Sequence, residues 1–206
     1  RGKNAAMQQT GLNFQQAPPI SVPFRFFLTA PVFALLAAVV MLWNGEEMLV
    51  ARWSPATLAA VHLLTLGFMT MVMAGAMFQM LPVLAGTPVP RSRMVASIVH
   101  PALLLGTLLF AGSLLFAQPM LLKIAISLLS VGLVVFLVAI LLTLSRTRKQ
   151  TATVFAMGLA TTALGVTLLF GLTLSASRAW GIALPSLSLR DLHPVWGLIG
   201  WTGLLV

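Results

Sequence analysis

The sequence contains no cysteine and no tyrosine, and only three of its 206 residues are acidic. Without cysteine the chain forms no disulfide, binds no iron–sulfur cluster and attaches no haem through thioether bonds. It also contains no Walker loop, dinucleotide fingerprint or hydrolase elbow. The sequence therefore gives no support to soluble-enzyme chemistry, and a bound metal would need histidine, methionine or oxygen ligands.

Charge of either sign is scarce, and hydrophobic residues make up 59% of the chain. A mean hydropathy of +1.03 is typical of an integral membrane protein. A helix needs about 20 apolar residues to cross a bilayer, and five runs meet this length, at 24–43, 56–83, 94–117, 120–144 and 152–174. The prediction is an all-α, polytopic transmembrane bundle of five complete helices and the start of a sixth near residue 192. We expect residues 1–206 to form one transmembrane domain, truncated at its C-terminal end, that is the N-terminal half of a larger bundle.

The basic residues fall in short clusters between these runs, as topology signals do, and do not form a nucleic-acid-binding patch. Eight lie on one predicted side and four on the other: Arg1, Lys3, Arg25, Arg91, Arg93, Arg146, Arg148 and Lys149 against Arg52, Lys123, Arg178 and Arg190. The positive-inside rule then predicts a multi-pass protein with a cytoplasmic segment at 1–23 and an outer interfacial loop at 175–191.

Local signals mark some helix ends. Ser54 before Pro55 predicts the N-cap of the second helix, and Ser188 and Asp191 have the spacing of a capping box before the sixth. In the outer loop that holds Glu46 and Glu47, Arg52 is expected to pair with one of the two glutamates.

The three histidines are the candidate functional residues. His62 and His193 are predicted in the outer leaflet, at similar depth, whereas His100 precedes Pro101 near the cytoplasmic end of the third helix and is expected to be an interfacial cap. A polar side chain inside a membrane is costly, so it usually has a partner or a function. The alternative is a simple hydrogen bond to a neighbouring helix.

Helical projection predicts what surrounds each histidine. Met69 and Met73 lie on the His62 face and would form an apolar wall for a flat cofactor; alternatively they fill gaps between helices. Gly197 and Gly200 clear the His193 face of side chains, which admits either a close-packed helix or a flat cofactor.

The runs "HLLTLGFMTMVMAGAMFQMLPVLAG" (62–86) and "HPVW" (193–196), with their helix order, resemble the first half of subunit I of the haem–copper oxidases and their small oxidase-like and NnrS-like relatives. The resemblance implies that His62 is an axial ligand of a b-type haem and that His193 is a haem or metal ligand. It also implies an oxidoreductase of the bacterial inner membrane, with electron transfer or O2 or NO binding at the haem and with an electron-donor protein or quinol as partner. Copper belongs to that family, but no copper ligand set falls within this segment. Trp196 stands where the family has tyrosine, and no glutamate follows Pro194.

Two other functions fit the same sequence. The protein would be a transporter if His62 lined a substrate or proton path. It would be a non-catalytic assembly subunit if its glycine-rich helices packed against another chain. In every case we expect the lipid bilayer to be its environment, in a homo- or hetero-oligomer, without nucleic acid.

Overall fold

The computed structural model describes residues 13–148, 151–183 and 186–205, and these residues form helices and connecting turns without any strand. The helices are η1 (Phe14–Gln16), α2 (Ser21–Asn44), α3 (Glu47–Val50), α4 (Pro55–His62), η2 (Leu63–Met69), α5 (Thr70–Ala85), α6 (Ser92–Leu115), α7 (Pro119–Arg146), α8 (Ala152–Trp180), α9 (Ser186–Val195) and η3 (Trp196–Thr202). Both η2 and η3 are π-helical. The predicted all-α helix bundle is confirmed.

Five stretches are long and apolar enough to cross a membrane: 21–44, 55–85, 92–115, 119–146 and 152–180. They match the five predicted runs to within a few residues, except at the end of the fifth. That helix continues to Trp180 because no glycine or proline interrupts 175–180, and it ends where Gly181 adopts φ +66°. The predicted outer loop at 175–191 is therefore largely helical, since α9 already begins at Ser186.

Of the two predicted helix caps, the one at Ser54 is confirmed and the one at Ser188 and Asp191 is wrong. Ser54 caps α4, its Oγ accepting the Thr57 amide at 3.2 Å, with Pro55 in the first turn as expected. The predicted capping box at Ser188 and Asp191 is wrong, because α9 starts at Ser186 and both residues lie inside it. Asp191 instead forms an ion pair with Arg52, 3.2 Å between Oδ1 and Nη2, which corrects the expected pairing of Arg52 with a loop glutamate.

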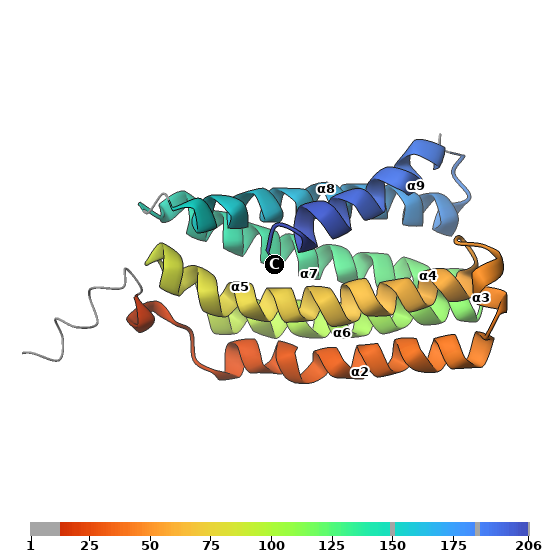
Figure 1. The fold of residues 1–206 in the computed structure, drawn as a ribbon, viewed down its shortest axis with the longest axis horizontal. Helices are drawn as coiled ribbons and strands as arrows, with labels where there is room; N and C mark the ends of the chain where they lie inside the picture. The colour runs from red at the N-terminus through yellow and green to blue at the C-terminus, as the bar shows by residue number, and fades with distance from the viewer. Residues whose placement is uncertain (1–12, 149–150, 184–185, 206) are drawn as a thin grey trace, which may run out of the picture.

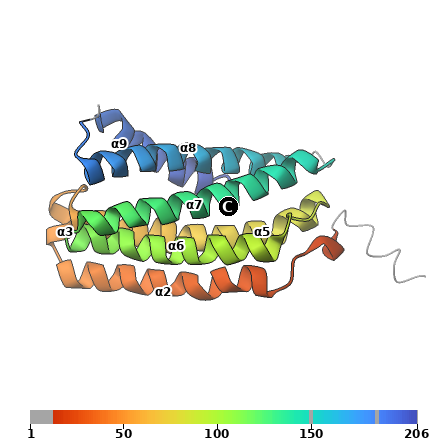
Figure 2. The same ribbon diagram turned by 180° about the vertical axis from the view of Figure 1, so that it is seen from behind.

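The long helices run roughly parallel and antiparallel in stacked layers (Figures 1 and 2). In both views α2 forms one outer side, α8 and α9 form the other, and α4, α5, α6 and α7 lie between them. One end of the bundle, here called the Arg52 end, holds the α3–α4 turn, the start of α7 and the end of α8.

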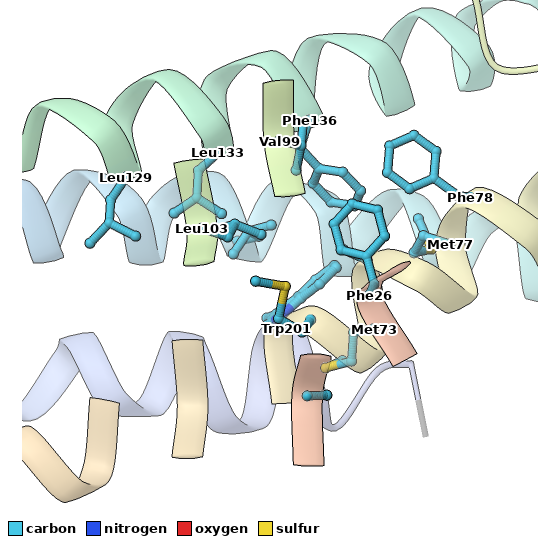
Figure 3. Packing of buried hydrophobic residues seen from close by; sticks show 14 of the residues in the cluster. Phe26, Met73, Met77, Phe78, Val99, Leu103, Leu129, Leu133, Phe136 and Trp201 are labelled. Atoms are coloured by element: carbon cyan, nitrogen blue, oxygen red, sulfur yellow. The ribbon is translucent and has the colours of Figure 1, made fainter. Parts of the chain in front are cut away.

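A row of four aromatic rings from four elements crosses the bundle core, as Figure 3 shows. Phe26 of α2 contacts Phe78 of α5 with ring centroids 5.5 Å apart, and Phe78 contacts Phe136 of α7 at 5.6 Å. Phe136 then meets Trp201 of η3 at 6.2 Å, edge to face. All four side chains are almost fully buried. Each such pair stabilises the fold by about 0.5–1.5 kcal/mol beyond the burial of its surface area. The row therefore connects η3 to α2 through the core.

A candidate cofactor site between His62 and His193

The imidazole rings of His62 and His193 face each other across the interior of the bundle. Their centroids lie 6.2 Å apart and their planes differ by 15°. His62 is the last residue of α4, and His193 lies in the last turn of α9. The two histidines predicted to share a depth are therefore brought together, and both line one cavity of about 540 Å³.

Each histidine is oriented by a backbone carbonyl. His62 Nδ1 lies 2.7 Å from the Leu58 carbonyl oxygen, one turn earlier in its own helix, and His193 Nδ1 lies 3.1 Å from the Thr167 carbonyl oxygen of α8. A carbonyl oxygen only accepts hydrogen bonds, so both Nδ1 atoms carry the proton. In a neutral imidazole this leaves the Nε2 lone pair free, and neither Nε2 has a hydrogen-bond partner among the described residues.

The cavity wall is mainly apolar. α7 contributes Leu122, Ile126, Leu129 and Leu133, and α6 contributes Leu114 and Phe110, whose ring centroid lies 4.7 Å from that of His62. The side chains of α8 and of the α9–η3 helix close the opposite side. Few polar groups interrupt this surface, which suits a flat hydrophobic ligand rather than a hydrated ion.

Two arginines line the cavity at the Arg52 end. Arg178 is in the last turn of α8, and Arg190 is in α9, three residues before His193. Within the described ranges the one ion pair joins Arg52 and Asp191, so neither lining arginine has a carboxylate partner there. The cavity is therefore apolar along its length and positively charged at one end.

The π-helix η2 changes which residues face the cavity below His62. Thr65, Leu66 and Thr70 line it, whereas Met69 and Met73 do not. Projection at 3.6 residues per turn fails here because η2 has i→i+5 bonds; the Thr70 amide, for example, bonds to the Thr65 carbonyl. Met73 is buried in the core instead, which fits the alternative that the methionines fill gaps between helices.

Gly197 and Gly200 pack the α9–η3 helix against α8. A Cβ at Gly200 would lie 2.7 Å from Ala163 Cβ, and one at Gly197 would lie 3.2 Å from Thr167 Cγ2. Gly197 also lines the cavity, but Gly200 does not. Of the two interpretations of these glycines, the close-packed helix is the one their contacts favour.

His100 lies apart from this site. It is two turns into α6 rather than at a helix start, and its Nε2 lies 2.8 Å from Thr29 Oγ1 of α2. The Thr29 hydroxyl donates to the Arg25 carbonyl at 2.7 Å, so it accepts the bond from His100. The expected interfacial cap is replaced by an interhelical hydrogen bond.

The described residues contain no group of three or more His, Cys, Asp or Glu side chains that could hold a metal ion. Sequence reasoning found the histidine pair but missed Thr167, Gly171 and the two cavity arginines. The arginines were counted only as topology signals, and nothing in the sequence shows which α8 carbonyl is left open to His193.

The whole chain was compared with known proteins. No protein-family model, no curated protein and no solved structure matches it.

Proposed function

We propose that this protein binds a b-type haem in the cavity, with His62 and His193 as its two axial ligands, and that it serves in electron transfer. The observation that carries the proposal is the facing pair of imidazoles, each turned by a backbone carbonyl so that Nε2 is free. A ligating histidine usually donates its other ring nitrogen to a carbonyl or carboxylate in this way.

The number of protein ligands supports a porphyrin over a bare metal ion. Catalytic and structural zinc sites use three or four protein ligands, and the described residues offer two. A porphyrin supplies four nitrogens itself and needs only axial ligands. His62 and His193, whose ring centroids lie 6.2 Å apart, would be those two ligands.

The cavity also suits the two chemical parts of haem. Its apolar wall would cover the macrocycle, and Arg178 and Arg190 would hold the propionates at the Arg52 end. Guanidinium groups form strong, charge-assisted hydrogen bonds to carboxylates. Because Asp191 is occupied by Arg52, both arginines are open to an anionic ligand.

When bound, haem would supply one-electron redox chemistry. If both His62 and His193 hold the iron, electron transfer is favoured over oxygen or nitric oxide binding. The chain's own part is to fix both rings, exclude water with apolar side chains and set the potential through burial.

The expected topology fits this role. With the N-terminal side in the cytoplasm of a bacterial inner membrane, the Arg52 end faces outward and the site lies in the outer leaflet. An electron-donor protein or a quinol would then meet the haem edge at that end, where Trp53 lines the cavity.

Transport is the weaker alternative. A transported ion is usually held by unwound backbone in broken helices. The π-helices after the two histidines keep their backbone bonds, as Gly203 shows by donating to the Leu198 carbonyl at 2.8 Å. They therefore expose no row of free carbonyls to the cavity.

The proposal is tested by haem content in the purified protein, measured as pyridine haemochrome. We expect about one haem per chain in the wild type and in the matched control His100→Ala, whose ring bonds to Thr29. We expect a large loss of haem in His62→Ala and only a partial loss in His193→Ala, where His62 still holds the iron. Wild-type protein that is folded, made with ample haem and still haem-free would overturn the proposal.

A further inference from the structure

Near the site, α8 and the α9–η3 helix contact each other at two points, and at each point a side chain of one helix packs against a glycine of the other. His193 of α9 lies over Gly171 of α8, and four residues away in each helix Thr167 of α8 lies over Gly197 of η3. A Cβ at Gly171 would lie 3.0 Å from His193 Cε1, a closer approach than side chains normally make, and 3.6 Å from Nδ1, an ordinary contact. The His193 ring therefore occupies the space that a side chain at 171 would fill.

Gly171 also controls access to the carbonyl that orients His193. In an α-helix the carbonyl of residue 167 accepts from the amide of residue 171, and the Cβ of a helical residue leans toward the helix N-terminus, over the preceding turn. A side chain at 171 would thus stand beside the Thr167 oxygen. Because none is there, that oxygen accepts a second bond, 3.1 Å from His193 Nδ1.

We propose that Gly171 is the positioning residue for His193: its missing side chain leaves the Thr167 carbonyl open, so that His193 is held as the Nδ1–H tautomer with Nε2 turned to the cofactor. The inference rests on the proposed function. Its contact with His193 distinguishes Gly171 from Gly158 and Gly165 on the same helix, where an added Cβ would have no atom closer than 4.0 Å.

The consequence concerns the second axial bond. Loss of a partner that orients a metal ligand typically costs about 10–100-fold in metal affinity. In Gly171→Ala and, more strongly, Gly171→Val, we expect the fraction of haem that has lost His193 to rise by about tenfold, because the ring is displaced from the Thr167 oxygen.

Carbon monoxide binding to the reduced haem measures the fraction of haem that has lost His193, because the gas needs an open axial position. Wild type and the matched control Gly165→Ala should give little carbon monoxide difference signal, and both Gly171 variants a strong one. In a His193→Ala background the position is already open, so adding Gly171→Ala should change nothing further; an additional change there would mean a general packing defect and contradict the inference.

The possible failures are distinguishable. If the wild type contains haem and the Gly171 variants bind no more carbon monoxide than the wild type does, the role of Gly171 is overturned and the proposed function still stands. Haem-free wild type overturns the proposed function, and the inference with it. If Gly171→Val does not fold, Gly171→Ala decides between the same outcomes, because its added atom is a single Cβ.

Discussion

The rings of His62 and His193 lie 6.2 Å apart although three long helices separate them along the chain. Each ring has one nitrogen bonded to a backbone carbonyl and one without a hydrogen-bond partner among the described residues, and both side chains line a mainly apolar cavity. Both nitrogens without a hydrogen-bond partner belong to side chains that line the cavity, so both are available to a ligand there. The predictions below test what that ligand requires of the surrounding residues and what holds the helices in place.

The cavity arginines should anchor an anionic ligand. We expect Arg178→Gln and Arg190→Gln to release haem several-fold faster, because each loses a charge-assisted hydrogen bond from a solvent-exposed side chain. Transfer of haem to an excess of apomyoglobin measures the rate. Lys123→Gln is the matched control, because Lys123 lies at the same end, over the Trp180 ring, and does not line the cavity. Equal release from all three variants would exclude the arginines as anchors.

The contact between Gly200 and Ala163 should be sensitive to volume. Gly200→Ala places a Cβ 2.7 Å from the Ala163 Cβ, and overpacking of this kind costs about 1–3 kcal/mol. Ala163→Gly in the same chain should restore most of the loss, which detergent-based unfolding curves measure. Gly158→Ala has open space around its Cβ and should be neutral or slightly stabilising. A double variant no more stable than Gly200→Ala would refute the close contact.

The hydrogen bond between His100 and Thr29 should contribute modestly to stability. Interhelical hydrogen bonds in membrane proteins average about 0.6 kcal/mol, so Thr29→Val should lower the free energy of unfolding by about that amount. Haem content should not change, because this pair is outside the cavity. A double-mutant cycle with His100→Ala isolates the pair, and a coupling energy of zero would show that the two side chains act independently.

The ion pair between Arg52 and Asp191 should contribute little. Both side chains are largely exposed, at 72% and 63%, and such surface pairs typically contribute about 0–1 kcal/mol. Asp191→Asn should therefore unfold almost as the wild type does. A stability loss well above 1 kcal/mol would show instead that the pair holds α9 over the cavity.

Much of the fold could be predicted because a membrane-spanning helix must be apolar and about 20 residues long. The predicted cap of α4 by Ser54 is one example. The end of α8 was predicted less accurately. The segment Ser175–Trp180 contains no helix-breaking residue, so the helix continues until Gly181 ends it.

The site was only partly predictable. An intramembrane histidine is a recognisable signal, so His62 and His193 were found. The neighbours of His62 were not, because a uniform helical period places Met69 and Met73 on its face while the π-helix brings Thr65 and Thr70 there instead. Gly171 is one of 16 glycines, and only the position of α9 distinguishes it.

The central claim is axial ligation by both histidines, and near-infrared magnetic circular dichroism of the oxidised wild-type protein tests it most directly, because its charge-transfer band identifies the axial ligand pair. The account predicts a six-coordinate, low-spin haem with two imidazole ligands, which becomes five-coordinate in His193→Ala. A high-spin, five-coordinate haem in the wild type, or a ligand pair that includes methionine, would contradict it.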